Sequence, residues 1–175
     1  MVHQHFKLVQ NYTITENIIL GLKKKDKLFG ILPYVDLKKA DQEIEALSKK
    51  YGLEVNPIDV IENTSVSTQQ RVEILKMLYR DNEILIFDEP TAVLTPQEID
   101  ELMEIMRGFK AEGKSILFIT HKLNEIMAVA DRCTVLRKGK YIGTVDIANS
   151  SKEELSRMMV GRDVQLQVDK SRRPA

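Results

Sequence analysis

The chain has 175 residues, of which 43% are hydrophobic, so it suits one packed domain, or one domain with a tail. Lysine plus arginine and aspartate plus glutamate number 26 each, which excludes a strong net field for nucleic acid or anionic lipid. The single cysteine, Cys133, excludes an intrachain disulfide, and no apolar run approaches the roughly 20 residues of a membrane helix. We therefore expect a globular protein of a reducing cytoplasm.

The first half of the chain predicts two helices joined by a loop. Residues 1–35 mix short apolar runs with the basic stretch KKKDK and carry little pattern. Asp36 is a predicted N-cap, and apolar residues then recur at helical spacing until Gly52, which predicts an amphipathic helix. The polar segment from Gly52 to Ser67 predicts a loop, and the stretch QQRVEILKMLY after it predicts a second helix.

The next segment predicts a strand followed by a helix. EILIF, which ends at Asp88 and Glu89, is short and apolar throughout, as in a parallel strand covered on both faces. Thr95 and Glu98 form a predicted capping box for a helix that ends near Gly113. The two carboxylates therefore stand at the carboxyl end of the strand.

The last part predicts a strand, a short helix, a hairpin and a final helix. SILFIT is a second buried-looking strand ending at His121, and LNEIMAVA predicts a short helix. CTVLRKGKYIGTV predicts two strands around a Lys-Gly turn. The final helix opens at Ser150 or Ser151 and reaches Gly161, and residues 162–175 have no periodicity.

Strands that alternate with helices predict an α/β fold with a mostly parallel sheet, where ligands bind at the carboxyl ends of the strands. A cation that bridges phosphates prefers one carboxylate at a fixed strand end, so Asp88 is a candidate magnesium ligand. Glu89 is a candidate for polarising an attacking water, because it stands next to the metal site. The alternatives are a helix-capping or turn-forming aspartate at Asp88 and a solvated acid at Glu89.

Longer stretches around these residues resemble one protein family. ILIFDEPTAVLTPQE resembles the Walker B strand and following loop of ABC ATPases, especially those of simple-sugar and nucleoside importers. QQRVEILKMLYR and ILFITHKLNEIMAVADRCTVLRKGK resemble the same family in order and spacing. The resemblance implies a partial P-loop NTPase fold of the ABC ATPase type with a helical subdomain at residues 1–161, and a linker or tail at 162–175.

The same resemblance implies roles for three residues at strand ends. Asp88 corresponds to the Walker B aspartate and Glu89 to the catalytic glutamate. His121 corresponds to the switch histidine, which contacts the γ-phosphate and the attacking water. An imidazole in that place donates to a phosphate oxygen while it orients water.

Two further motifs of the family have counterparts here. MVHQHFKLV resembles the Q-loop, which implies that Gln4 senses magnesium and water. TSVSTQQR stands where the signature loop lies, which implies that Ser65 and Gln70 contact nucleotide held by a partner domain. The family's glycine is replaced by Ser67 and the glutamine after it by Thr68, so a Cβ occupies a site where backbone approaches phosphate.

One element of the family has no counterpart in the sequence. A phosphate-binding loop of the form GxxxxGK[ST] does not occur among the 175 residues. In the family this loop precedes the Q-loop, so we expect Met1 to be an internal start or a truncation. We also expect the chain alone to be inactive.

The resemblance implies an ATP-hydrolysing component of an importer for sugars or nucleosides, with ATP and Mg²⁺ as cofactors. Its implied partners are transmembrane permease subunits and a second nucleotide-binding domain, with no nucleic acid. Its implied place is the cytoplasmic face of the cell membrane. The alternatives are a docking or remnant module that binds no nucleotide alone, and an ABC protein that acts away from membranes.

Overall fold

The computed structural model describes residues 7–22, 27–28, 32–33 and 36–161. Clustering of contacts divides the chain into two compact units, Met1–Ile119 and Thr120–Ala175. Gln4 and the predicted tail at 162–175 lie outside the described residues.

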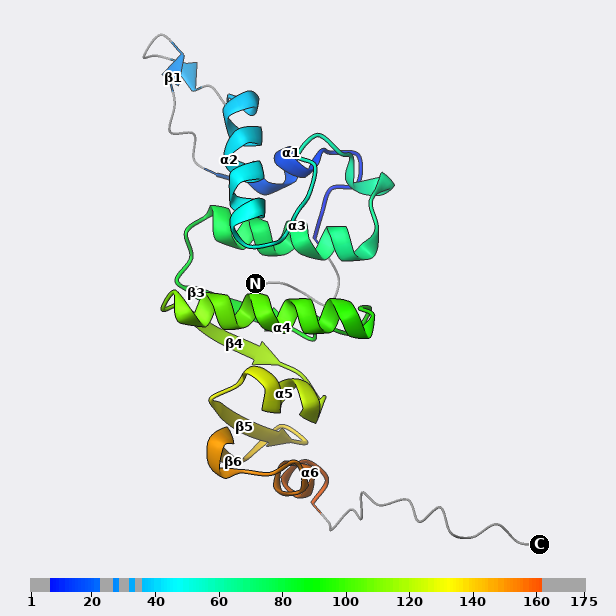
Figure 1. Cartoon of the computed structure of the whole chain (residues 1–175), viewed down its shortest axis with the longest axis vertical. Helices are drawn as coiled ribbons and strands as arrows, with labels where there is room; N and C mark the ends of the chain where they lie inside the picture. The colour runs from blue at the N-terminus through cyan, green and yellow to red at the C-terminus, as the bar shows by residue number, and fades with distance from the viewer. Residues whose placement is uncertain (1–6, 23–26, 29–31, 34–35, 162–175) are drawn as a thin grey trace, which may run out of the picture. The chain divides into compact units, whose positions relative to one another are not determined.

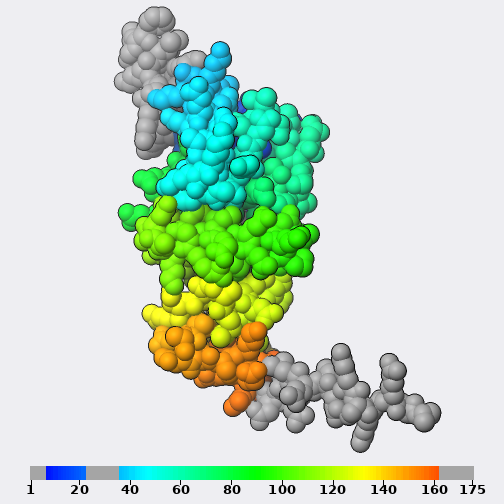
Figure 2. All heavy atoms as spheres, viewed as in Figure 1, coloured from blue at the N-terminus to red at the C-terminus, as the bar shows by residue number. Residues whose placement is uncertain are grey.

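Three helices of the first unit pack pairwise on one another (Figure 1). In the space-filling view of Figure 2, the cyan residues of α2 and the green residues that follow α3 form a continuous surface. The elements of this part are α1 (Ile14–Ile19), the antiparallel pair β1 (Lys27–Leu28) and β2 (Leu32–Pro33), α2 (Leu37–Lys50), a 3₁₀ turn (Ile61–Asn63) and α3 (Val66–Tyr79).

Caps at the starts of the helices explain where they begin. The carboxylate of Asp36 accepts from the backbone N–H of Lys39 at 3.1 Å, so α2 starts where the sequence predicts it. Helix α1 was not predicted, although Thr13 and Glu16 form a complete capping box. The signal Thr-x-x-Glu is therefore present in the sequence, ahead of a helix of only one and a half turns.

Helix α3 begins earlier than the sequence predicts. Ser65 is its N-cap, and the Ser65 hydroxyl accepts from the backbone N–H of Thr68 at 3.1 Å. The predicted loop to Ser67 is therefore two residues too long, because the cap residue precedes the apolar pattern that marks the helix. Ser67 and Thr68 stand in the first helical turn.

The second half of the unit contains a parallel strand pair and a helix. Strand β3 (Ile84–Asp88) pairs with β4 (Ser115–Ile119), and Asp88 stands opposite Ile119. Helix α4 (Pro96–Ala111) connects them and contacts β4 (Figure 1). The carboxyl ends of both strands therefore meet at one edge of the sheet, as predicted.

The two faces of this strand pair differ in burial. Leu85 and Phe87 are fully buried on one face. The opposite face carries Ile84, Leu117 and Ile119, which are 66%, 55% and 44% exposed. We call these three residues the exposed sheet face. The prediction of a strand covered on both faces is therefore wrong for the described residues. An unbroken apolar run predicts a strand but does not specify which elements cover each of its faces.

The second unit is built as the sequence predicts. Its buried core comprises Ile126, Val135, Ile147 and Leu155. The hairpin turn falls at a Lys-Gly pair with positive φ at both residues, a conformation suited to a tight two-residue turn. The elements are α5 (Leu123–Val129), β5 (Arg132–Arg137), β6 (Lys140–Asp146), a 3₁₀ turn (Ile147–Asn149) and α6 (Lys152–Val160).

Within the part of the chain that the structure describes, none of the helices combines the length and the apolar character needed to cross a membrane.

Candidate functional site

The two candidate carboxylates leave the strand pair through a tight turn. Asp88 is half-buried as the last residue of β3. The backbone N–H of Glu89 donates to the carbonyl of Ile119 at 2.9 Å, which extends the contact with β4 by one residue. The backbone N–H of Ala92 then donates to the carbonyl of Glu89 at 3.3 Å. We call residues 89–94 the post-strand turn.

The backbone of Glu89 is in an uncommon conformation. Its φ is +46°, in the left-handed region that residues other than glycine rarely adopt. Such conformations persist where the surrounding structure imposes them, and they occur often at functional sites. The hydrogen bond to Ile119 and the buried side chain of Thr91 hold the turn in place. The direction of the Cα–Cβ bond of Glu89 is therefore set by the fold.

A side chain from α3 provides a third constraint on this turn. Gln70 is 3% exposed, and its Nε2 donates to the carbonyl of Pro90 at 2.7 Å. Its Oε1 is buried without a hydrogen-bond partner in the structure. The predicted contact of Gln70 with nucleotide stays a prediction, but the structure adds a role that the sequence did not predict. Gln70 connects the signature-region helix to the residue after Glu89.

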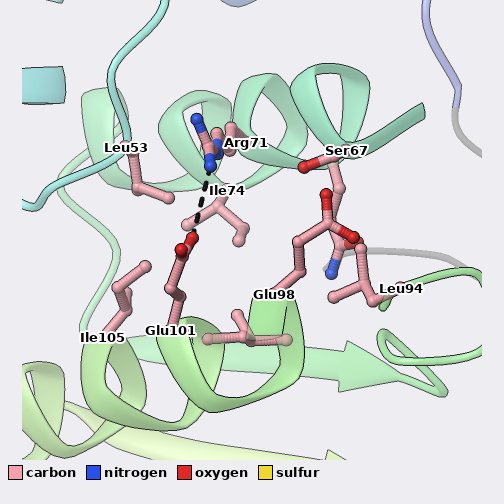
Figure 3. Close-up of a pocket in the computed structure, with 10 residues that line it drawn as sticks. Leu53, Ser67, Arg71, Ile74, Leu94, Glu98, Glu101 and Ile105 are labelled. Atoms are coloured by element: carbon pink, nitrogen blue, oxygen red, sulfur yellow. Dashed lines mark hydrogen bonds and ion pairs between the residues drawn. The ribbon is translucent and has the colours of Figure 1, made fainter. Parts of the chain in front are cut away.

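The signature region has its two serines in different surroundings. Ser65 is exposed, and its hydroxyl lies 3.0 Å from the hydroxyl of Thr68. Ser67 is half-buried and lines a cavity between α3 and α4, together with Glu98 (Figure 3). The pKa of Glu98 lies below its ordinary value, chiefly because its carboxylate accepts from the Thr95 backbone N–H and also because the Ser67 hydroxyl lies near it. The serine that replaces the family's glycine therefore lies beside an acidic side chain of α4.

The cavity beside Ser67 is small. Its volume is about 30 Å³, which is enough for one water molecule. An ion pair between Arg71 and Glu101, 3.4 Å long, crosses it from α3 to α4 (Figure 3). A nucleotide does not fit in this space, so the cavity belongs to helix packing.

His121 lies in the second unit, two residues beyond the end of β4. Its side chain is exposed, which suits a residue that contacts a phosphate. Its approach to Asp88 and Glu89 stays a prediction. Gln4, the remaining predicted site residue, lies outside the described residues.

The residues fit a magnesium ion that arrives with its phosphates. In the described ranges no group of three or more His, Cys, Asp or Glu side chains is placed to hold a metal. Mg²⁺ in phosphate chemistry keeps several waters and takes one or two carboxylates, with phosphate oxygens as further ligands. Asp88 alone satisfies the protein share of that set. The backbone cradle for the phosphates is not among the 175 residues.

A parallel strand pair joined by a helix, with an aspartate and a glutamate at its carboxyl edge, places the chain in the α/β class of folds. The sequence profile of the family described as ABC transporter matches residues 1–92. The chain belongs to the ABC transporter family.

The chain is similar to ATP-binding proteins of importers. It is 57% identical over 171 residues to the nucleoside import ATP-binding protein NupA of Lactococcus lactis, covering 98% of this chain and 33% of that protein. It is 55% identical over 170 residues to the guanosine import ATP-binding protein NupO of Bacillus subtilis, covering 97% and 32%. The ribose import ATP-binding protein RbsA 2 of Streptomyces coelicolor is 41% identical over 174 residues, covering 99% and 32%. The chain thus spans about a third of these relatives' length.

Solved structures share the fold at low identity. An inward-facing ABC transporter superposes with a TM-score of 0.74 at 17% identity, over 90% of this chain and 62% of that chain. A dimeric ATP-binding cassette bound to ADP and phosphate gives 0.68 at 23% identity, over 83% and 61%. The predicted family and α/β fold class are confirmed. The parallel part of the sheet in the described residues is the β3–β4 pair.

Proposed function

We propose that this chain supplies part of the ATP-hydrolysing component of an ABC importer for nucleosides or sugars. The observation that carries the proposal is the strand end, where Asp88 and Glu89 leave β3 through a turn held from β4 and α3. The 57% identity to a nucleoside import protein over 98% of the chain supports the nucleoside class first. Sugar import proteins match at lower identity, as the ribose relative does.

In this proposal each residue has one task. Asp88 holds the magnesium ion through water, and the ion neutralises charge on the phosphates when it is bound. Glu89 orients and polarises the attacking water, because it follows the proposed magnesium ligand directly at the strand end. His121 donates a hydrogen bond to a phosphate oxygen.

The remaining assignments belong to the same proposal. Ser65 and Gln70 contribute to the signature surface that meets the nucleotide of a second nucleotide-binding domain, and Gln4 relays nucleotide state to transmembrane permease subunits. Residues 1–161 form the ATPase part and residues 162–175 a linker or tail. The component works on the cytoplasmic face of the cell membrane.

A second candidate function is a docking or remnant module that binds no nucleotide alone. It is supported by Ser67, which stands where the family has a glycine. The position of Ser67 in the cavity beside Glu98 adds support, because the serine lies against α4.

A chimera separates the two candidates. The matching stretch of the Lactococcus lactis relative is replaced by this chain, and Mg-ATP hydrolysis and nucleoside uptake are measured in cells lacking that relative. Hydrolysis that Glu89→Gln abolishes supports the ATPase proposal. A folded chimera that neither hydrolyses ATP nor regains activity on Ser67→Gly contradicts it and supports the docking module.

A further inference from the structure

A buried carboxylate lies just after His121 in the second unit. Glu125 is 5% exposed and stands in the first turn of α5. A buried carboxylate is unfavourable unless it is paired and hydrogen-bonded. The Thr120 hydroxyl donates to Glu125 Oε2 at 2.9 Å. Lys122 Nζ lies 3.3 Å from Glu125 Oε1 and forms an ion pair with it, although Oε1 accepts no hydrogen bond. Both partners are direct neighbours of His121 in the chain.

A further hydrogen bond closes this arrangement. The backbone N–H of Lys122 donates to the Thr120 hydroxyl oxygen at 3.1 Å. The three contacts therefore close a ring through Thr120, Lys122 and Glu125. His121 lies in the chain between Thr120 and Lys122. The side chains on both sides of His121 are held by one buried carboxylate, and the Thr120 hydroxyl also holds the backbone N–H of Lys122.

Helix capping alone does not account for this geometry. Lys122 is the N-cap of α5 and makes no side-chain cap bond. A glutamate three residues after an N-cap normally accepts from the backbone N–H of the cap residue. Here that N–H is bonded to Thr120, and Glu125 accepts from the Thr120 side chain, two residues before the N-cap. The carboxylate thus orders the segment that carries His121.

We propose that Glu125 is a positioning residue for His121. By holding Thr120 and Lys122, it restricts the backbone of His121 and limits the imidazole to one rotamer although the ring is exposed. The catalytic meaning of this restriction rests on the proposed function, in which the imidazole contacts a phosphate. The restriction itself is a property of the second unit.

The test is NMR spectroscopy of the full chain with labelled histidine. The sequence has three histidines, so His121→Asn assigns the signal of His121. We expect couplings across χ1 of His121 that indicate one rotamer in the unchanged chain and rotamer averaging in Glu125→Ala. Glu125→Gln keeps an acceptor for Thr120 and restores the single rotamer. Glu153→Ala, at an exposed glutamate of α6, is the matched control and leaves the His121 couplings unchanged.

A second variant covers the case in which Glu125→Ala unfolds the unit. Thr120→Val keeps the shape of the side chain and removes the hydroxyl, and we expect the same loss of the single rotamer with the β5–β6 amide signals preserved. Rotamer averaging of His121 in the unchanged chain overturns the proposal, and so does a single rotamer in both Glu125→Ala and Thr120→Val. The NMR experiment needs no nucleotide. If the chimera is inactive while His121 shows one rotamer that Glu125→Ala and Thr120→Val abolish, the proposed function is overturned and this inference stands.

Discussion

The side chain of Gln70 donates from Nε2 to the carbonyl of Pro90 at 2.7 Å. The bond joins the helix of the signature region to the residue that follows Glu89, across a long stretch of sequence. Because Gln70 is buried, water does not compete for either group. The orientation of the post-strand turn therefore depends on α3 as well as on the strand pair.

Replacement of Gln70 by leucine tests this dependence. Leucine removes the donor and leaves the Pro90 carbonyl buried without a partner, which costs on the order of 1–3 kcal/mol in the free energy of unfolding. Urea unfolding of the chain measures the loss. Gln97→Leu, at an exposed position of α4, is the control and leaves stability nearly unchanged. Equal losses for the two variants argue against the role of Gln70.

Glu98 predicts a dependence of stability on pH. Its pKa in the folded state is lowered, chiefly by the Thr95 backbone N–H and then by the Ser67 hydroxyl. The folded state therefore favours the ionised form, so the stabilisation is present above the ordinary pKa of 4.5 and lost as the pH falls through the folded pKa.

Two variants isolate that contribution. Glu98→Gln removes the titrating group, so its unfolding free energy declines less than that of the unchanged chain as the pH is lowered past the ordinary pKa. Ser67→Ala removes the hydroxyl that helps to lower the pKa of Glu98, so an NMR titration of the Glu98 carboxyl shows its pKa closer to the ordinary value. If the pKa of Glu98 is the same in Ser67→Ala as in the unchanged chain, the Ser67 hydroxyl does not lower it.

The exposed sheet face predicts self-association of the isolated chain. Its three apolar residues are large and more than two-fifths exposed, and apolar surface of this kind favours contact between molecules. Leu117→Lys places a charge in the middle of the face and lowers the sedimentation coefficient at high protein concentration. Leu136→Lys, at a residue 69% exposed on β5, is the control with no effect. A monomeric unchanged chain that melts cooperatively contradicts the prediction.

The isolated chain is expected to show no measurable Mg-ATP hydrolysis. One carboxylate pair does not position phosphates for in-line attack without a loop that holds them. A phosphate-release assay with excess Mg-ATP measures this directly. Turnover that disappears in Glu89→Gln refutes the expectation.

The sequence by itself determined the local elements and the family. Helices α2, α4 and α6 begin at the side-chain caps Asp36, Thr95 and Ser151. These caps are predictable from the sequence, because capping is a contact between residues three positions apart. The resemblance of ILIFDEPTAVLTPQE to the family was recognised for the same reason, since its residues are contiguous. Helix α1 was missed because its six residues are too few for periodicity to appear.

Tertiary structure alone decided how these local parts serve a site. Three features depend on which helices pack together: the partner of Gln70, the proximity of Ser67 to Glu98, and the burial of each face of β3. The left-handed φ of Glu89 is imposed by bonds from β4 and α3, whereas its own side chain disfavours it. Residue spacing carries information about contacts within a few positions, and contacts between distant segments form only when the chain has folded.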